Sequence, residues 1–145
     1  DACIHEIRQA KEQNHHIFIV EFASWGSTNK KILQLVDKYS QVYFITKCKN
    51  DGSDLIVAET KKQGIYLKEV RVCGVNSNFC VGSTVSGLSK KIPDLNIKIV
   101  RPACNCISWT RWNKNTYGGA EKLTNVKLVD LVRKQIRSKY LAISG

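Results

Sequence analysis

The 145-residue sequence has no methionine and only two prolines, and its apolar runs are far shorter than a bilayer span. A transmembrane helix needs about 20 consecutive apolar residues, so the sequence predicts none. Acidic residues are also few, 12 against 23 Lys and Arg, which gives a net charge of +11. A disordered chain is excluded because 43% of the residues are hydrophobic and only 24% are charged. The basic surplus favours anionic partners but says little about the fold.

The six cysteines do not predict a disulfide framework. Small disulfide-rich domains consist largely of loops, whereas Cys3, Cys73 and Cys80 fall inside predicted helices or strands. The sequence has no Cys-x-x-Cys pair, and Cys104-Asn105-Cys106 is too tight for ordinary zinc ligands, which argues against metal binding by the cysteines. This pattern favours a reducing environment, and we expect a cytoplasmic protein with no membrane partner.

Strand-like and helix-like segments alternate along the chain. Buried strands are predicted over residues 17–20, 42–45, 70–75 and 97–100. Helices are predicted over residues 2–14, after Thr28, from 53 or 54 to about 63, over 79–91 and over 128–140, with a short strand near 126. The alternation predicts one domain over residues 1–145, an α/β three-layer αβα sandwich around a mainly parallel, Rossmann-like sheet.

Cys80 lies where the third predicted strand passes into a helix. Proteins with parallel sheets bind their ligands at the carboxyl ends of the strands, so this position suits a catalytic or ligand-binding residue. The open N–H groups and the dipole at a helix start favour a thiolate and can hold a developing oxyanion. A nucleophilic cysteine is one interpretation, and a small buried apolar side chain is the other.

Lys47 ends the second predicted strand, at the same edge of the sheet as Cys80. An ammonium group beside a thiol stabilises the thiolate electrostatically. The alternative interpretation is a surface lysine at the end of a strand, which is common in a chain with this many lysines.

The segment Gly-Val-Asn-Ser-Asn-Phe-Cys-Val-x-x-Thr at residues 74–84 resembles the nucleophile motif of the isochorismatase-like cysteine hydrolases, the nicotinamidase/isochorismatase superfamily. The order of predicted strands is also similar over roughly residues 4–106. The resemblance implies a hydrolase that cleaves a small amide, or a related bond, through a thioester on Cys80. It assigns Lys47 to an Asp–Lys–Cys triad.

The resemblance also implies how the oxyanion is held. The family's cis peptide bond would fall between Val75 and Asn76 in this sequence. The backbone N–H groups of Asn76 and Cys80 would then form the oxyanion hole. A cis bond without proline costs about 3–4 kcal/mol, so its presence would mark a functional site.

The sequence departs from the family in three places. In the family, the triad Asp belongs to an Asp-x-Gln motif at the end of a first strand. This motif has no counterpart from Asp1 onward. We expect the strand that carries it to lie upstream, in a separate segment or chain. Nicotinamidase-type members bind a metal through Asp and His after the next strand, whereas residues 21–26 contain no His, so we expect no metal and no other cofactor. Residues 101–103 read Arg-Pro-Ala in place of an Asp-Ala pair, which makes the pocket more basic.

The predicted partner is a small-molecule substrate. The sequence leaves open whether the chain forms a homo-oligomer. Three loop tryptophans on the crevice side are expected either to form an apolar wall against a flat ring or to pack the loops: Trp25, Trp109 and Trp112. The alternative functions are a catalytically inactive family member and a basic module that binds nucleic acid through phosphates and base stacking. The spread of the basic residues along the chain disfavours the nucleic-acid module.

Overall fold

The computed structural model describes residues 2–75 and 77–105. Helices and strands alternate there in the order α1 (Ala2–Glu12), β1 (Ile17–Phe22), α2 (Lys30–Val36), β2 (Val42–Lys47), α3 (Ser53–Lys62), β3 (Glu69–Val75), η1 (Ser77–Val81), α4 (Gly82–Lys91) and β4 (Asn96–Asn105). The predicted α/β fold is confirmed. The predicted strand near residue 126 and the helix over 128–140 lie outside the described residues. Every helix in the described part falls short of the length and hydropathy that a membrane span requires.

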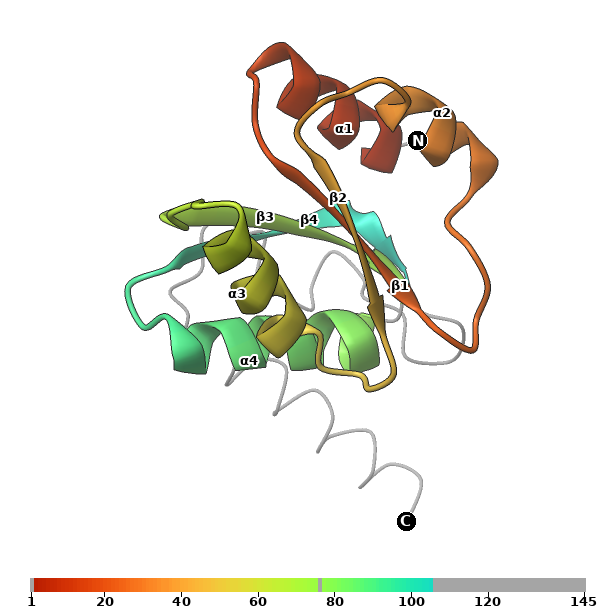
Figure 1. The fold of residues 1–145 in the computed structure, drawn as a ribbon. Coiled ribbons are helices and arrows are strands. Elements are labelled where there is room, and N and C mark those ends of the chain that lie inside the picture. The colour runs from red at the N-terminus through yellow and green to blue at the C-terminus, as the bar shows by residue number, and fades with distance from the viewer. Residues whose placement is uncertain (1, 76, 106–145) are drawn as a thin grey trace, which may run out of the picture.

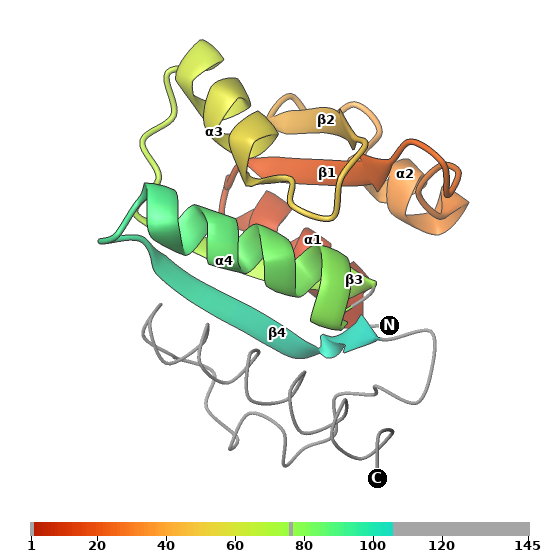
Figure 2. The same ribbon diagram turned by 90° about the horizontal axis from the view of Figure 1, so that it is seen from below.

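The four strands form two parallel pairs. β1 pairs with β2 from Ile17↔Val42 to Phe22↔Lys47, and β3 pairs with β4. Within residues 2–75 and 77–105 no hydrogen-bonded ladder joins β1 to β3, so each pair is a separate two-stranded sheet. Figure 2 shows β1 and β2 on one side and β4 on the other, with α4 crossing in front of β3.

Helices cover both faces of the strands, which gives the three predicted layers. Figure 1 shows α1 and α2 on one face of the strands and α3 and α4 on the other. Alternate residues of β1 enter the two apolar clusters: Ile17 and Ile19 pack with α1 and α2, whereas Phe18 and Val20 pack with the cluster of α3 and α4. Because successive strand residues point to opposite faces, a strand covered on both sides appears in the sequence as an unbroken apolar run.

β4 is longer than the sequence predicted, because it continues through Pro102 to Asn105. The register with β3 shifts between Val72 and Gly74, opposite this stretch. Proline has no N–H to donate to a ladder, and an irregularity of this kind lets the strand resume its pairing beyond the proline.

The helix predicted over residues 79–91 begins differently from an ordinary α-helix. A π-helical turn, η1, precedes α4. Cys80 belongs to that turn, so it lies at the start of the helix after β3 as predicted, in a turn of π-helical geometry. Single π-helical turns occur frequently at functional sites.

α4 lies close to the start of α3 at Gly87. A Cβ atom there would lie 2.2 Å from Ser53 Oγ and 2.5 Å from a carboxylate oxygen of Asp51. We therefore expect Gly87→Ala to lower the free energy of unfolding by about 1–3 kcal/mol in chemical denaturation. Ser86→Ala, one residue earlier on the same helix, is the matched control and should change it by less than about 0.5 kcal/mol. Equal stability of the two variants would contradict the observed packing.

Candidate active site

Cys80 lies in η1, directly after β3 and before α4. Its side chain is partly exposed, and its Sγ donates to the side-chain Oδ1 of Asn50 at 3.7 Å. π-Helical hydrogen bonds reach back five residues, so an N–H in the first turn has no intrahelical carbonyl to bond. The helix itself therefore leaves the N–H of Cys80 open to an anionic ligand.

Lys47 is the last residue of β2 and is buried, with 4% of its surface exposed. Its Nζ donates to the backbone carbonyl of Asn50 and lies 5.4 Å from the centre of the Phe22 ring. Its stem packs against Gly52, where a Cβ atom would come within 3.1 Å of Lys47 Cδ. The alternative interpretation of Lys47 as a surface lysine is therefore wrong.

Asn50, which the sequence analysis did not single out, connects the two predicted residues. Its backbone carbonyl accepts from Lys47 Nζ and from Thr84 Oγ1, the latter at 3.3 Å, while its side chain accepts from Cys80. Thr84 Oγ1 also accepts from the N–H of Gly52 at 3.0 Å. These bonds hold the segment after β2 against η1 and α4. The signal that could have identified Asn50 is its place in the turn that follows the strand of Lys47.

The ammonium group of Lys47 forms no ion pair with a carboxylate among residues 2–75 and 77–105. Burying a charge is costly unless it is paired and hydrogen-bonded. The Asn50 carbonyl and the Phe22 ring meet part of this requirement. The site therefore stabilises an anion placed beside Lys47, such as a thiolate or a carboxylate.

Most other residues predicted for the site are not brought to it by the described part of the chain. Trp25 is 67% exposed in the turn after β1. Asn76, and with it the predicted cis bond from Val75, lies outside the described residues, as do Trp109 and Trp112. The oxyanion hole and the tryptophan wall stay predictions.

At the end of β1, near which nicotinamidase-type members bind a metal, the acidic side chain is Glu21. Its carboxylate accepts the N–H of Thr28 at 2.7 Å, and this hydrogen bond holds the pKa of Glu21 below its usual value. In the described part of the chain, no three His, Cys, Asp or Glu side chains come together in a way that could hold a metal ion.

Known proteins with this architecture are found by structure and not by sequence. No known family profile and no curated protein sequence matches the chain significantly. The structure is similar to the nicotinamidase from Staphylococcus aureus, with a TM-score of 0.58 and 20% identity over 70% of this chain and 66% of that chain. For the pyrazinamidase/nicotinamidase from Streptococcus mutans the TM-score is 0.55, with 15% identity over 72% of this chain and 71% of that one.

A third similar structure is the MAR1 ribonuclease from Caenorhabditis elegans, with a TM-score of 0.66 and 15% identity over 92% of this chain and 60% of that chain. The chain thus spans about two thirds of the S. aureus nicotinamidase and less of the ribonuclease. At these identities the likeness establishes the fold alone. The chain has the fold of the nicotinamidases, which confirms the isochorismatase-like fold that the cysteine motif implied.

Proposed function

We propose that the chain is a cysteine hydrolase that cleaves a small amide, with Cys80 as the nucleophile and Lys47 as the group that stabilises its thiolate. One arrangement carries the proposal: a buried lysine at the end of β2 and a cysteine in the π-helical turn after β3 both bind Asn50. A purely structural cysteine would need no buried ammonium nearby. The nicotinamidases that share the fold support an amide as the substrate class.

The reaction follows from these groups in two steps. The Cys80 thiolate attacks the amide carbonyl carbon, and the N–H groups of Cys80 and Asn76 hold the oxyanion. The oxyanion collapses, the amine leaves with a proton from a general acid, and a thioester remains on Cys80. Water then attacks the thioester while a general base accepts its proton, which releases the carboxylic acid and the thiolate.

We further propose that the general acid and base is a carboxylate on another parallel strand, which pairs between β1 and β3 and comes from outside these 145 residues. Within the described ranges, β1 pairs only with β2 and β3 only with β4, so each has an edge for such a strand. The buried Lys47 ammonium would gain a carboxylate partner. The resemblance to the family requires a triad Asp, which has no counterpart from Asp1 onward. An Asp on the added strand between β1 and β3 would supply it.

A chromogenic anilide tests the nucleophile. With the p-nitroanilide of a small aromatic acid, we expect release of p-nitroaniline and a thioester that peptide mass spectrometry locates on Cys80. Cys80→Ala should abolish both. Lys47→Met should lower the acylation rate by about 100-fold. Its melting temperature should stay equal or rise, because the substitution removes a buried charge.

Cys48→Ala is the matched control, because it removes an exposed cysteine next to Lys47 in the sequence. It should keep the wild-type acylation rate. Acylation of Cys48 in place of Cys80, or an unchanged rate in Lys47→Met, would contradict the assignment.

The strand proposal predicts that the 145-residue chain stops after one turnover. We expect a burst of about one equivalent of p-nitroaniline, followed by a steady rate at least about 100-fold lower, because a general base contributes roughly 10²–10⁴-fold. Rapid-quench and steady-state absorbance measure the two phases. Sustained turnover without a burst would refute an external strand and leave Cys80 as the nucleophile.

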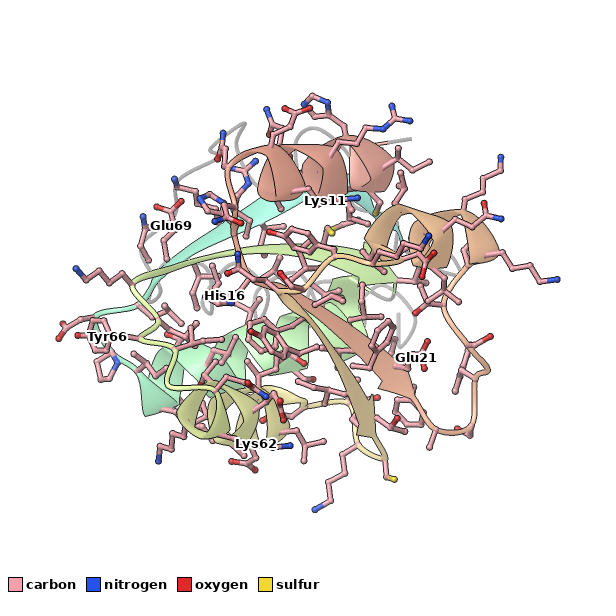
Figure 3. The ribbon with its side chains drawn as sticks, turned by 45° about the horizontal axis from the view of Figure 1, so that its top comes forward. Lys11, His16, Glu21, Lys62, Tyr66 and Glu69 are labelled. Atoms are coloured by element: carbon pink, nitrogen blue, oxygen red, sulfur yellow. The ribbon has the colours of Figure 1, made fainter. Side chains whose placement is uncertain are left out.

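A second candidate function, RNA binding, rests on a different observation. The similarity to a ribonuclease covers 92% of this chain, and the net charge is +11. Tyr66 is 82% exposed in the connection between α3 and β3, where it projects from the edge of the molecule (Figure 3), and Lys68 Nζ lies 5.9 Å from its ring centre. An exposed ring beside a cation suits base stacking and phosphate contact.

Titration of a fluorescent single-stranded RNA at several salt concentrations tests this function. Tyr66→Ala should weaken binding by roughly 5- to 150-fold if a base stacks on the ring. Lys68→Ala should reduce the slope of log affinity against log salt by about 0.7. Lys38→Ala, in the turn after α2, serves as the control and should change neither. Absence of binding at low salt, or equal effects of all three substitutions, would reject RNA binding through this surface.

A further inference from the structure

Cys3 of α1 and Cys73 of β3 lie where α1 meets the pair β3–β4, whereas the side chain of Cys104 in β4 packs against the apolar cluster of α3 and α4. The Sγ of Cys3 donates to the carbonyl of Ala103 at 3.3 Å. Cys104, the next residue of β4, has its Sγ 3.9 Å from the carbonyl of Val72, which precedes Cys73. Gly74 pairs with Cys104, so Cys73 lies about level with Ala103, whose carbonyl accepts from Cys3. This pair of thiols is distinct from the site around Cys80.

An ion pair holds α1 over β3. The Nε and one terminal nitrogen of Arg71 bind the two carboxylate oxygens of Glu6 at 2.7 and 2.9 Å. Glu6 lies about one helical turn after Cys3, and Arg71 lies two residues before Cys73 on the same face of the strand. The bidentate pair therefore fixes the position in which the two thiols meet.

The two thiols differ in acidity because of their contact. The Cys73 thiol, as a neighbouring donor, stabilises the Cys3 thiolate and lowers the pKa of Cys3 to about 7, whereas the same contact raises the pKa of Cys73. Burial raises the pKa of Cys104 to about 12, which keeps it a thiol. Cys3 is partly exposed and Cys73 is exposed, so a small oxidant reaches both. A nucleophilic thiolate thus lies beside a thiol that can react with its oxidised form.

We propose that Cys3 and Cys73 are a reversible oxidation site, at which a peroxide converts the two thiols into a disulfide that ties α1 to β3. The Cys3 thiolate attacks one oxygen of hydrogen peroxide, and the O–O bond breaks. Hydroxide is the leaving group, and Cys3 becomes a sulfenic acid. The Cys73 sulfur attacks that sulfur, the S–O bond breaks, and water departs with the Cys73 proton. The two sulfurs lose two electrons and the peroxide gains two. A thiol reductant reverses the change.

Peptide mapping of the full 145-residue chain with Cys80→Ala tests the site. The protein is treated with one equivalent of hydrogen peroxide, its remaining thiols are blocked with N-ethylmaleimide, and it is digested with trypsin without reductant. We expect a disulfide between the peptides 1–8 and 72–90, in which Cys3 and Cys73 are then the only cysteines. Dithiothreitol should remove it. Because Cys80 is absent, the result is independent of the proposed hydrolase.

Matched variants separate this pair from a general effect of oxidation. Cys104→Ser and Cys48→Ser should keep the cross-link, and Cys3→Ser should abolish it. Glu6→Ala should slow its formation by roughly two- to fivefold, because it loosens α1. The cross-linked chain should melt about 5–10 °C higher than the reduced chain, since the disulfide closes a long loop. A disulfide between Cys73 and Cys104, or free Cys3 and Cys73 thiols after peroxide has oxidised Cys48, would overturn the proposal.

Discussion

The hydrogen bonds that meet at Asn50 are the constraint on which the candidate active site depends. A parallel strand brings Lys47 to the correct edge of the sheet, but the direction of its side chain is set by the Asn50 carbonyl and by the missing Cβ at Gly52. The side chain of the same asparagine receives the thiol of Cys80. One residue therefore couples the end of β2 to the turn after β3, and the geometry of both reactive groups follows from a short connecting segment.

The two proposals place a reactive sulfur in two environments of the chain, which differ in their physics. Beside Asn50 the favourable element is a buried ammonium, whose field is strong because water is excluded around it. Under α1 it is a second thiol, Cys73, whose contact lowers the pKa of Cys3. In the proposed hydrolase the first arrangement suits attack on a carbon electrophile, because the N–H of Cys80 lies next to its own sulfur. The second suits redox chemistry, because the donor is itself a sulfur that can form a bond.

The sequence predicted the layers well, and the reasons are local. Apolar runs and helical periodicity depend on burial and geometry within a segment, so β1, β2, β3 and α4 were found close to their observed bounds. The burial of Lys47 was not predictable, because a lysine at the end of a strand is ordinarily solvated. The role of Asn50 and the approach of Cys3 to Cys73 depend on contacts between distant segments, which no local pattern encodes. The continuation of β4 past Pro102 needed a register shift that only the pairing shows.

The edges of β1 and β3 carry a consequence for the behaviour of the chain in solution. In the described ranges, neither strand is paired on its second side, so a row of backbone donors and acceptors is left for another strand. Such edges are templates for intermolecular pairing, and both strands are rich in β-branched residues. Where these edges meet other copies of the chain, repulsion between molecules that each carry a charge of +11 opposes their pairing. High salt screens that repulsion, so the basic surplus protects the protein from aggregation as well as attracting anions.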